Sequence, residues 1–149
     1  MGRVETVIEI EAPIEKVFAF AADPKSLELA PEEAGVKVEV TSEGPIGVGT
    51  TFRMTAVLAG RRVEGEEEYV EFEENRSFKS RQIKGTLKRF DITTVFEATE
   101  KGTKATATWD YELPYSVLGK ILDKLKARKA IERYVKTGWE KAKQILEEG

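Results

Sequence analysis

The stretch IEIEAPIEKVFAFAADP, residues 8–24, decides the fold because it contains the end of a strand and a complete short helix. Apolar and polar side chains alternate through residues 3–12, which predicts a β-strand. Pro13 is accepted in a first helical turn, and apolar residues then recur at helical spacing until an Asp-Pro pair stops the helix. Residues 25–30 predict a second short helix. The chain therefore opens with a strand followed by two short helices.

Downstream, the apolar pattern changes to a period of two. It predicts six strands joined by short turns into an antiparallel meander, over residues 36–40, 50–59, 61–72, 77–83, 86–98 and 103–113. The glycine-rich piece GPIGVG, residues 44–49, invites comparison with a phosphate-binding loop. It lies between two strands and not before a helix, so a plain turn is the better interpretation.

The C-terminal segment after Pro114 predicts one long amphipathic helix, about 48 Å in length at 1.5 Å per residue. Its apolar residues recur at steps of three and four, which is typical of a helix with one buried face. They are Leu118, Leu122, Leu125, Ile131, Val135, Trp139, Ala142 and Leu146, and Arg128 falls in a gap of the same stripe. The order of elements predicts an α+β helix-grip fold, in which a curved antiparallel sheet of about seven strands wraps around this helix.

Length and composition limit the classes of function that this chain can have. A chain of 149 residues is expected to form one domain, residues 1–149, with a substantial core. The sequence has no cysteine and no histidine, which excludes disulfides, cysteine nucleophiles, Ser-His-Asp hydrolysis and the usual zinc sites. We therefore expect no metal and no cofactor. The same composition, rich in Glu and Lys, is typical of a thermostable or designed chain.

The net charge of −3 argues against the overall basic charge that is typical of proteins that bind nucleic acids. Residues 115–149 hold nine Lys or Arg against five Asp or Glu, so this segment carries +4 and the rest of the chain −7. A basic helix packed on an acidic sheet is the plain interpretation, and a helix that binds membrane surfaces or RNA is the alternative. No apolar run is long enough for a membrane span or a signal peptide, so we expect a cytoplasmic protein with no nucleic-acid partner.

Three segments resemble the SRPBCC or START-like superfamily. The opening stretch is similar to the first strand and helix of that superfamily, with its Ala-Pro, Val-Phe and Asp-Pro pairs. GPIGVGTTFR and YELPYSVLGKIL resemble the polyketide cyclase/dehydrase-like branch. The resemblance implies a helix-grip fold over the entire chain and a cavity between sheet and helix. It implies no particular activity, because the superfamily includes carriers, receptors and cyclases, and no catalytic residue is carried over.

The strand parities predict which residues face the cavity. The last strand separates apolar from polar residues most clearly. Trp109 and Tyr111 lie on its apolar face, beside the small residues Ala105 and Ala107. The predicted cavity wall consists of Phe52, Met54, Gly65, Glu67, Tyr69, Ser80, Gln82, Phe90, Ile92, Thr94, Trp109, Tyr111, Leu118, Leu122, Leu125 and Arg128.

Glu67 is the unusual member of this set. The stretch VEGEEEYVEFEEN, residues 63–75, alternates like a strand although it carries seven glutamates. If Tyr69 faces inward, Glu67 does too, and a bulge near Val70 returns Phe72 to the core. A buried carboxylate must be paired, hydrated or protonated, and Arg128, Ser80 and Gln82 are the candidate partners. Glu67 then contacts a ligand or belongs to an internal ion pair or a hydrated cavity floor.

Three functions remain open. The first is a non-enzymatic binding or carrier protein for a small hydrophobic molecule, because small residues on the inner face leave space under the helix. The second is a polyketide cyclase or aldol-type enzyme with Glu67 as general acid or base. The third is a structural or engineered scaffold in which the cavity is incidental.

Overall fold

The computed structural model describes residues 2–114 and 124–149. Within these ranges lie seven strands, two α-helices and two short 3-10 helices. In chain order they are β1 (Gly2–Ile10), α1 (Ile14–Ala22), η1 (Pro24–Leu29), η2 (Glu32–Ala34), β2 (Lys37–Val40), β3 (Thr51–Leu58), β4 (Arg61–Glu73), β5 (Ser77–Gly85), β6 (Arg89–Ala98), β7 (Thr103–Glu112) and α2 (Lys124–Glu148).

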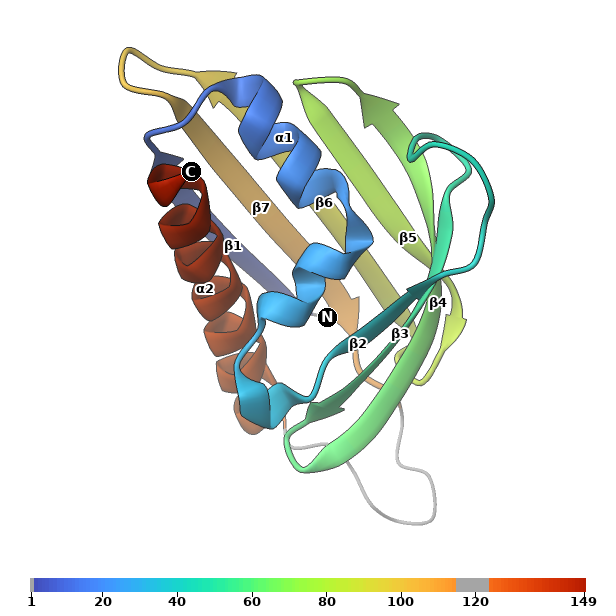
Figure 1. Ribbon diagram of the computed structural model, residues 1–149. Coiled ribbons are helices and arrows are strands. Elements are labelled where there is room, and N and C mark those ends of the chain that lie inside the picture. Colours follow the sequence, from blue (N-terminus) through green and yellow to red (C-terminus); the bar gives the residue numbers. More distant parts are fainter. Residues whose placement is uncertain (1, 115–123) are drawn as a thin grey trace.

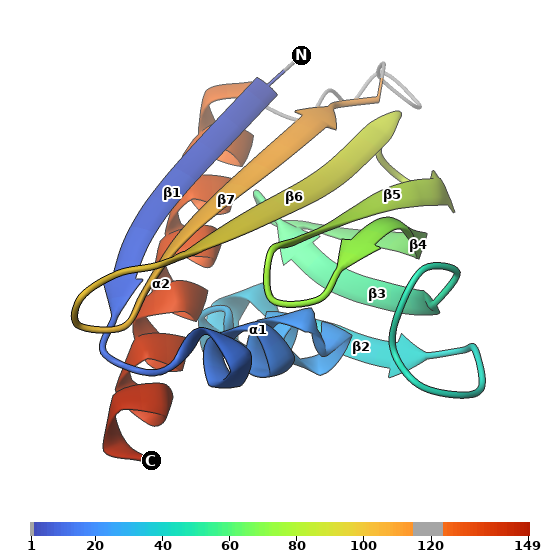
Figure 2. The ribbon, with the colours of Figure 1, turned by 90° about the horizontal axis from the view of Figure 1, so that it is seen from above.

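The strands form one antiparallel sheet in the order β1-β7-β6-β5-β4-β3-β2. Every neighbour in the sheet is a neighbour in the chain, except that β1 pairs with β7 from Gly2 opposite Tyr111 to Ile10 opposite Thr103. The sheet curls, and α1, η1 and α2 lie on its concave side (Figures 1 and 2). The α+β helix-grip architecture expected from the sequence is therefore confirmed.

The second predicted helix is not a single helix in the structure. The segment folds as two 3-10 helices, Pro24–Leu29 and Glu32–Ala34, and the second of these was not expected. A proline occupies or precedes the first position of each, and the short stretch between Pro24 and Pro31 leaves too few residues for a stable α-helix. Gly35, at φ 54°, ends the second turn and sends the chain into β2.

Strand β4 contains the predicted irregularity. Its register with β5 shifts between Tyr69 and Glu71, so Val70 is the extra residue, and the parity change directs Phe72 toward the core. A second shift lies between Glu66 and Glu67. Because bulges bend a strand and increase its twist, these two irregularities help the sheet to curl around the helices.

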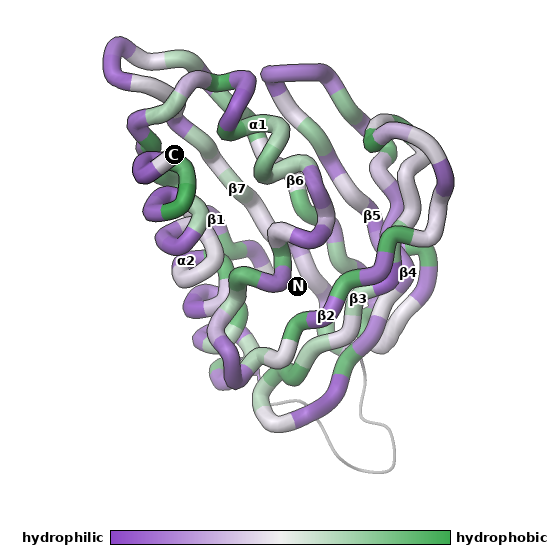
Figure 3. The backbone as a smooth tube through the Cα atoms, in the orientation of Figure 1, coloured by the Kyte–Doolittle hydropathy of each residue, from purple (hydrophilic) through white to green (hydrophobic). Residues whose placement is uncertain are grey.

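The core forms two clusters of buried side chains. The first is aromatic and surrounds Phe18, whose ring meets those of Phe72, Phe78 and Phe96 edge to face with centroids 5.2–5.8 Å apart. The second lies toward the other end of the sheet and includes Phe90, with residues of α2 packed against it. In Figure 3 the turn between β6 and β7 is hydrophilic, and α2 alternates between hydrophilic and apolar residues, as expected for a helix with one buried face.

Candidate ligand-binding cavity

A cavity of about 130 Å³ lies between the concave face of the sheet and the helices. Strands β3 to β7 form one wall, and η1 and α2 form the other. Pockets for drug-sized ligands are larger, typically about 300–1,000 Å³, so this cavity suits a compact molecule.

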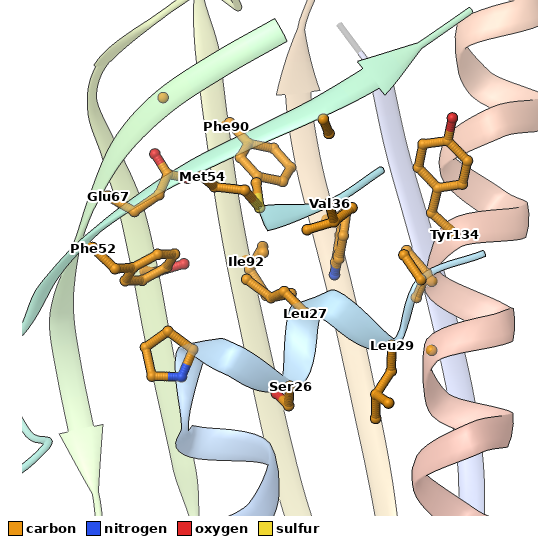
Figure 4. Close-up of a pocket in the computed structure, with 18 of the residues that line it drawn as sticks. Ser26, Leu27, Leu29, Val36, Phe52, Met54, Glu67, Phe90, Ile92 and Tyr134 are labelled. Carbon is orange, nitrogen blue, oxygen red and sulfur yellow. The ribbon is translucent and has the colours of Figure 1, made fainter. Parts of the chain in front are cut away.

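Eleven of the sixteen side chains predicted from the sequence line this cavity. They come from β3 to β7 and are Phe52, Met54, Gly65, Glu67, Tyr69, Ser80, Gln82, Phe90, Ile92, Thr94 and Trp109. Figure 4 shows Glu67 entering the space beside Phe52 and Met54, with Phe90 and Ile92 on the neighbouring wall. Their contact with a ligand stays a prediction.

Of the remaining five predicted residues, three lie elsewhere and two fall outside the described ranges. Tyr111 is buried in the second core cluster and does not reach the cavity. Leu125 is 61% exposed, and the half-exposed Arg128 forms an ion pair with Glu132, with 2.9 Å between Nε and Oε1. Leu118 and Leu122 lie outside the described residues.

The prediction for Arg128 was wrong because the buried stripe of α2 reaches back from Ile131 by a step of four, to Ala127, and not by a step of three. It runs through Ala127, Ile131 and Val135, which are four residues apart and so lie nearly above one another. Arg128 is one residue past this stripe, or about 100° around the helix, and faces solvent. Of the small residues that suggested a cavity, only Gly65 lines it, because Ala105 and Ala107 are buried away from the cavity wall.

The helices supply wall residues that strand parity did not indicate. From η1 and its flanks come Pro24, Ser26, Leu27, Leu29, Ala30 and Val36, and from α2 come Ile131, Tyr134, Val135, Gly138, Trp139 and Ala142. The helical spacing of the α2 residues was visible in the sequence and could have identified them. Gly138 faces the end of η1 and not a bulky sheet residue: an added Cβ would lie 3.9 Å from the nitrogen of Ala30.

Glu67 is the only fully buried carboxylate on this wall among the described residues. Its exposed fraction is 0%, and neither carboxyl oxygen has a hydrogen-bond partner within the described part of the chain. Burial, and to a lesser degree the nearby charge of Asp91, raise the pKa of Glu67 to about 9. With a pKa this high the free protein holds Glu67 in the protonated, neutral form at pH 7.

The neighbours of Glu67 form no hydrogen bond with its carboxyl group. Gln82 lies opposite Glu67 in the β4–β5 register, but its amide Nε2 donates to the carbonyl oxygen of Leu87 at 2.8 Å. Gly65 creates the room that both side chains occupy. The point where a Gly65 Cβ would stand is 3.1 Å from Oε1 of Gln82 and 3.4 Å from Oε2 of Glu67. One amide oxygen and one carboxyl oxygen therefore border the same small space.

Three hydroxyl groups of the wall are engaged with backbone carbonyls. The Tyr69 hydroxyl donates to Ala22, and the Tyr134 hydroxyl donates to Val57, each with 2.5 Å between the oxygens. The Ser26 hydroxyl is 3.2 Å from the carbonyl oxygen of Ala21. Burial raises the pKa of both tyrosines, so these groups remain protonated donors at neutral pH.

Two further properties follow from the described ranges, 2–114 and 124–149. They contain no group of three or more Asp or Glu side chains arranged to hold a metal ion, and the sequence has no His or Cys. No helix within them is both long and apolar enough to cross a membrane.

Comparison with solved structures gives whole-chain matches. A Thermus thermophilus protein, TTHA0849, has a TM-score of 0.79 at 27% identity, with 97% of each chain covered. A START superfamily protein from Mycobacterium smegmatis has a TM-score of 0.73 at 15% identity, over 96% of this chain and 98% of that one. The di-domain ARO/CYC StfQ from the steffimycin biosynthetic pathway matches at 0.72 and 18% identity, over 98% of this chain and 50% of its own.

No curated protein sequence matches this chain. The family model described as "Polyketide cyclase / dehydrase and lipid transport" matches residues 1–147, which is nearly the full length. It agrees with the superfamily resemblance of the sequence, with the fold and with the matched START structure. This chain therefore belongs to the polyketide cyclase/dehydrase and lipid transport family.

Proposed function

We propose that this protein binds a small, mainly hydrophobic molecule in the cavity between sheet and helices, and that it acts as a carrier and not as an enzyme. The single observation that carries the proposal is the cavity itself, whose wall is apolar apart from a few polar groups. A compact cleft with apolar walls and few polar anchors is typical of small-molecule sites. Membership of a family that includes lipid transport supports the same function.

The test is a titration with the neutral fluorescent probe N-phenyl-1-naphthylamine, followed by dye emission. We expect saturable binding at one site per chain. Met54 faces the cavity from β3, so Met54→Trp should fill part of the space and weaken binding at least tenfold. Val57 lies on the same strand with the opposite parity and is 37% exposed, so Val57→Trp serves as the matched control and should bind like the unchanged protein.

Failure of the probe to saturate, or equal binding by the two tryptophan variants, would contradict the carrier proposal. Such a result would instead support a scaffold function in which the cavity is incidental.

A second candidate function is catalysis of the cyclase or aldol type. The observation that favours it is Glu67, an unpaired carboxyl group in the cavity whose pKa of about 9 suits a general acid at neutral pH. Turnover of a polyketide-like substrate should then fall by roughly 10²-fold or more in Glu67→Gln. Unchanged turnover in this variant would exclude Glu67 as the acid or base.

A further inference from the structure

The hydrogen-bonding capacity of the cavity is unbalanced. The donors of Tyr69 and Tyr134 point to backbone carbonyls, and the Gln82 amide donates to Leu87. On the cavity wall, the described residues leave the carboxyl group of Glu67 without a hydrogen-bond partner, and Oε1 of Gln82 borders the same space. When Glu67 is ionised, this corner holds only acceptors, so a ligand that complements it brings hydrogen-bond donors.

The cavity wall is also unbalanced in charge. Its acidic side chains are Glu67 and the exposed Glu64. No Lys or Arg lies among the described wall residues. A carboxylate buried without a cation is costly, so Glu67 stays protonated in the free protein, and a cation that enters the cavity favours its ionised form.

The elements around Glu67 offer no competing cation. Across from it stand Phe52 on β3 and Gln82 on β5. From the helical side the wall residues of η1 and α2 are apolar or uncharged. Besides burial, the charge that raises the pKa of Glu67 is the carboxylate of Asp91 on β6, which has the same sign as an ionised Glu67.

From these contacts we infer that the natural ligand carries a basic amine, whose ammonium group binds Glu67 and Gln82 beside Gly65 while its apolar body fills the rest of the cavity. The inference rests on the proposed function and names the ligand's chemical class. Three N–H donors of a primary ammonium match the two carboxyl oxygens and the one amide oxygen at this corner. Aromatic walls such as Phe52, Phe90 and Trp109 tolerate a cationic ligand better than aliphatic walls do.

The binding reaction has a proton balance that can be measured. At pH 7 the free protein holds Glu67 as a neutral carboxyl group, and the free amine is an ammonium ion. Formation of the ion pair therefore releases the Glu67 proton to solvent, and no bond other than this O–H breaks. The apparent affinity should rise about tenfold for each pH unit between pH 6 and 8, because the ionised fraction of Glu67 rises tenfold.

The experiment compares three probes with the same aromatic body by isothermal titration calorimetry. They are 2-(1-naphthyl)ethylamine, 2-(1-naphthyl)ethanol and 1-naphthylacetate. At pH 8 we expect the amine to bind at least tenfold more tightly than the alcohol, and the carboxylate to bind most weakly. Repeating the amine titration in phosphate and Tris buffers, which differ in heat of ionisation, should show release of close to one proton.

Variants test the residue assignment. Glu67→Gln should reduce amine affinity at least tenfold and leave alcohol affinity nearly unchanged. Glu66→Gln is the matched control, because Glu66 is adjacent, faces the other side of the sheet and pairs with Arg53 and Lys84. Circular dichroism checks that both variants fold, and the comparison of amine with alcohol in the unchanged protein does not depend on any variant.

Two outcomes would overturn the inference in distinguishable ways. Equal affinity for amine and alcohol, with no proton release, would show that Glu67 acts only as a neutral hydrogen-bonding group, and the carrier proposal would stand. Absence of binding by all three probes together with the uncharged dye would overturn the carrier proposal as well.

Discussion

Two carboxylates are buried in the same sheet, one on each face. Glu67 on β4 faces the cavity, is 0% exposed and has no partner among the described residues. Asp91 on β6 faces the outer side and is 2% exposed. The guanidinium of Arg89 lies 2.8–2.9 Å from its Oδ2, and Arg81 lies 3.9 Å from its Oδ1. Burial alone therefore does not decide the state of a carboxyl group.

The difference comes from which cations can reach each face. On the outer face, Arg3, Asp110, Asp91, Arg81 and Glu68 occupy successive positions across the β1, β7, β6, β5 and β4 register, so charges of both signs lie side by side. Arginine can lay its aliphatic part on the sheet and keep its guanidinium in water. On the concave face an arginine would have to bury its charge under the helices, and the described wall contains none.

The largest expected effect is on the pH dependence of stability. The folded-state pKa of Glu67, about 9, lies above the unfolded value of about 4.5, so between these values the unfolded state binds fewer protons. The free energy of unfolding should fall as pH rises from 5 to 8, by on the order of 4 kcal/mol at about 1.4 kcal/mol per unit. Glu67→Gln should remove most of this slope and be the more stable protein at pH 8.

Urea denaturation at several pH values between 5 and 8 measures this effect. Glu66→Gln again provides the control, and its slope should equal that of the unchanged protein. If Glu67→Gln also keeps the original slope, Glu67 is ionised in the folded protein and the contrast with Asp91 disappears.

The next effect is expected on the outer face. Asp91→Asn removes the charge that Arg89 and Arg81 contact, but both arginines remain half exposed and can be solvated. We therefore expect a loss of about 1–2 kcal/mol in the free energy of unfolding at pH 7, opposite in sign to the effect of Glu67→Gln. The carboxyl carbon of Glu67, followed by NMR, should also titrate at lower pH. An unchanged Glu67 titration would show that the two carboxylates are independent.

A smaller effect is expected across the cavity from Glu67. Gly138 lies inside α2, where glycine costs up to about 1 kcal/mol relative to alanine. An added Cβ would meet no atom closer than 3.9 Å, so Gly138→Ala should raise the free energy of unfolding by about 0.5–1 kcal/mol. Gly102→Ala is a useful contrast, because its Cβ would collide with the backbone at Ile10 and should destabilise the protein. Thermal denaturation of both variants checks these signs.

The smallest effect concerns Arg128. Its partner is Glu132 on the surface of α2, and exposed pairs of this spacing contribute about 0.3–0.5 kcal/mol. Arg128→Ala should change stability by no more than this and leave the titration of Glu67 and the affinity for the amine probe unchanged. A lowered amine affinity or a shifted Glu67 titration in this variant would show that Arg128 acts on the cavity after all.

Strand parity predicted the sheet side of the cavity well. It placed Glu67 and Gly65 inside and required a bulge near Val70, because only one extra residue lets both Tyr69 and Phe72 face the core. Strand parity is informative here because a strand in a sheet with one buried face must alternate between buried apolar and exposed polar side chains. The seven strands, their order and the long helix followed from the same patterns together with the family resemblance.

The helical side was harder to predict. The predicted stripe of α2 was correct from Ile131 onward, but steps of three and of four are both compatible with a helix, and packing selected Ala127 instead of Arg128, which lies about 100° further around. The contribution of η1 depends on how two prolines turn the chain over the cavity, which no periodic pattern records. Hydrogen bonds between different elements, such as the one from the Tyr134 hydroxyl to the backbone carbonyl of Val57, likewise depend on the tertiary structure.

The pairing of β1 with β7 has a consequence for folding during synthesis. Gly2–Ile10 is made first, yet its hydrogen-bonding partner Thr103–Tyr111 follows roughly 100 residues later. At about 5–20 residues per second on the ribosome, β1 waits on the order of 5–20 s for its partner. Contacts so distant in sequence also slow folding, since a long loop must close before they form. Of the seven strands, β1 thus waits longest for its partner and is the segment that a chaperone has most time to bind.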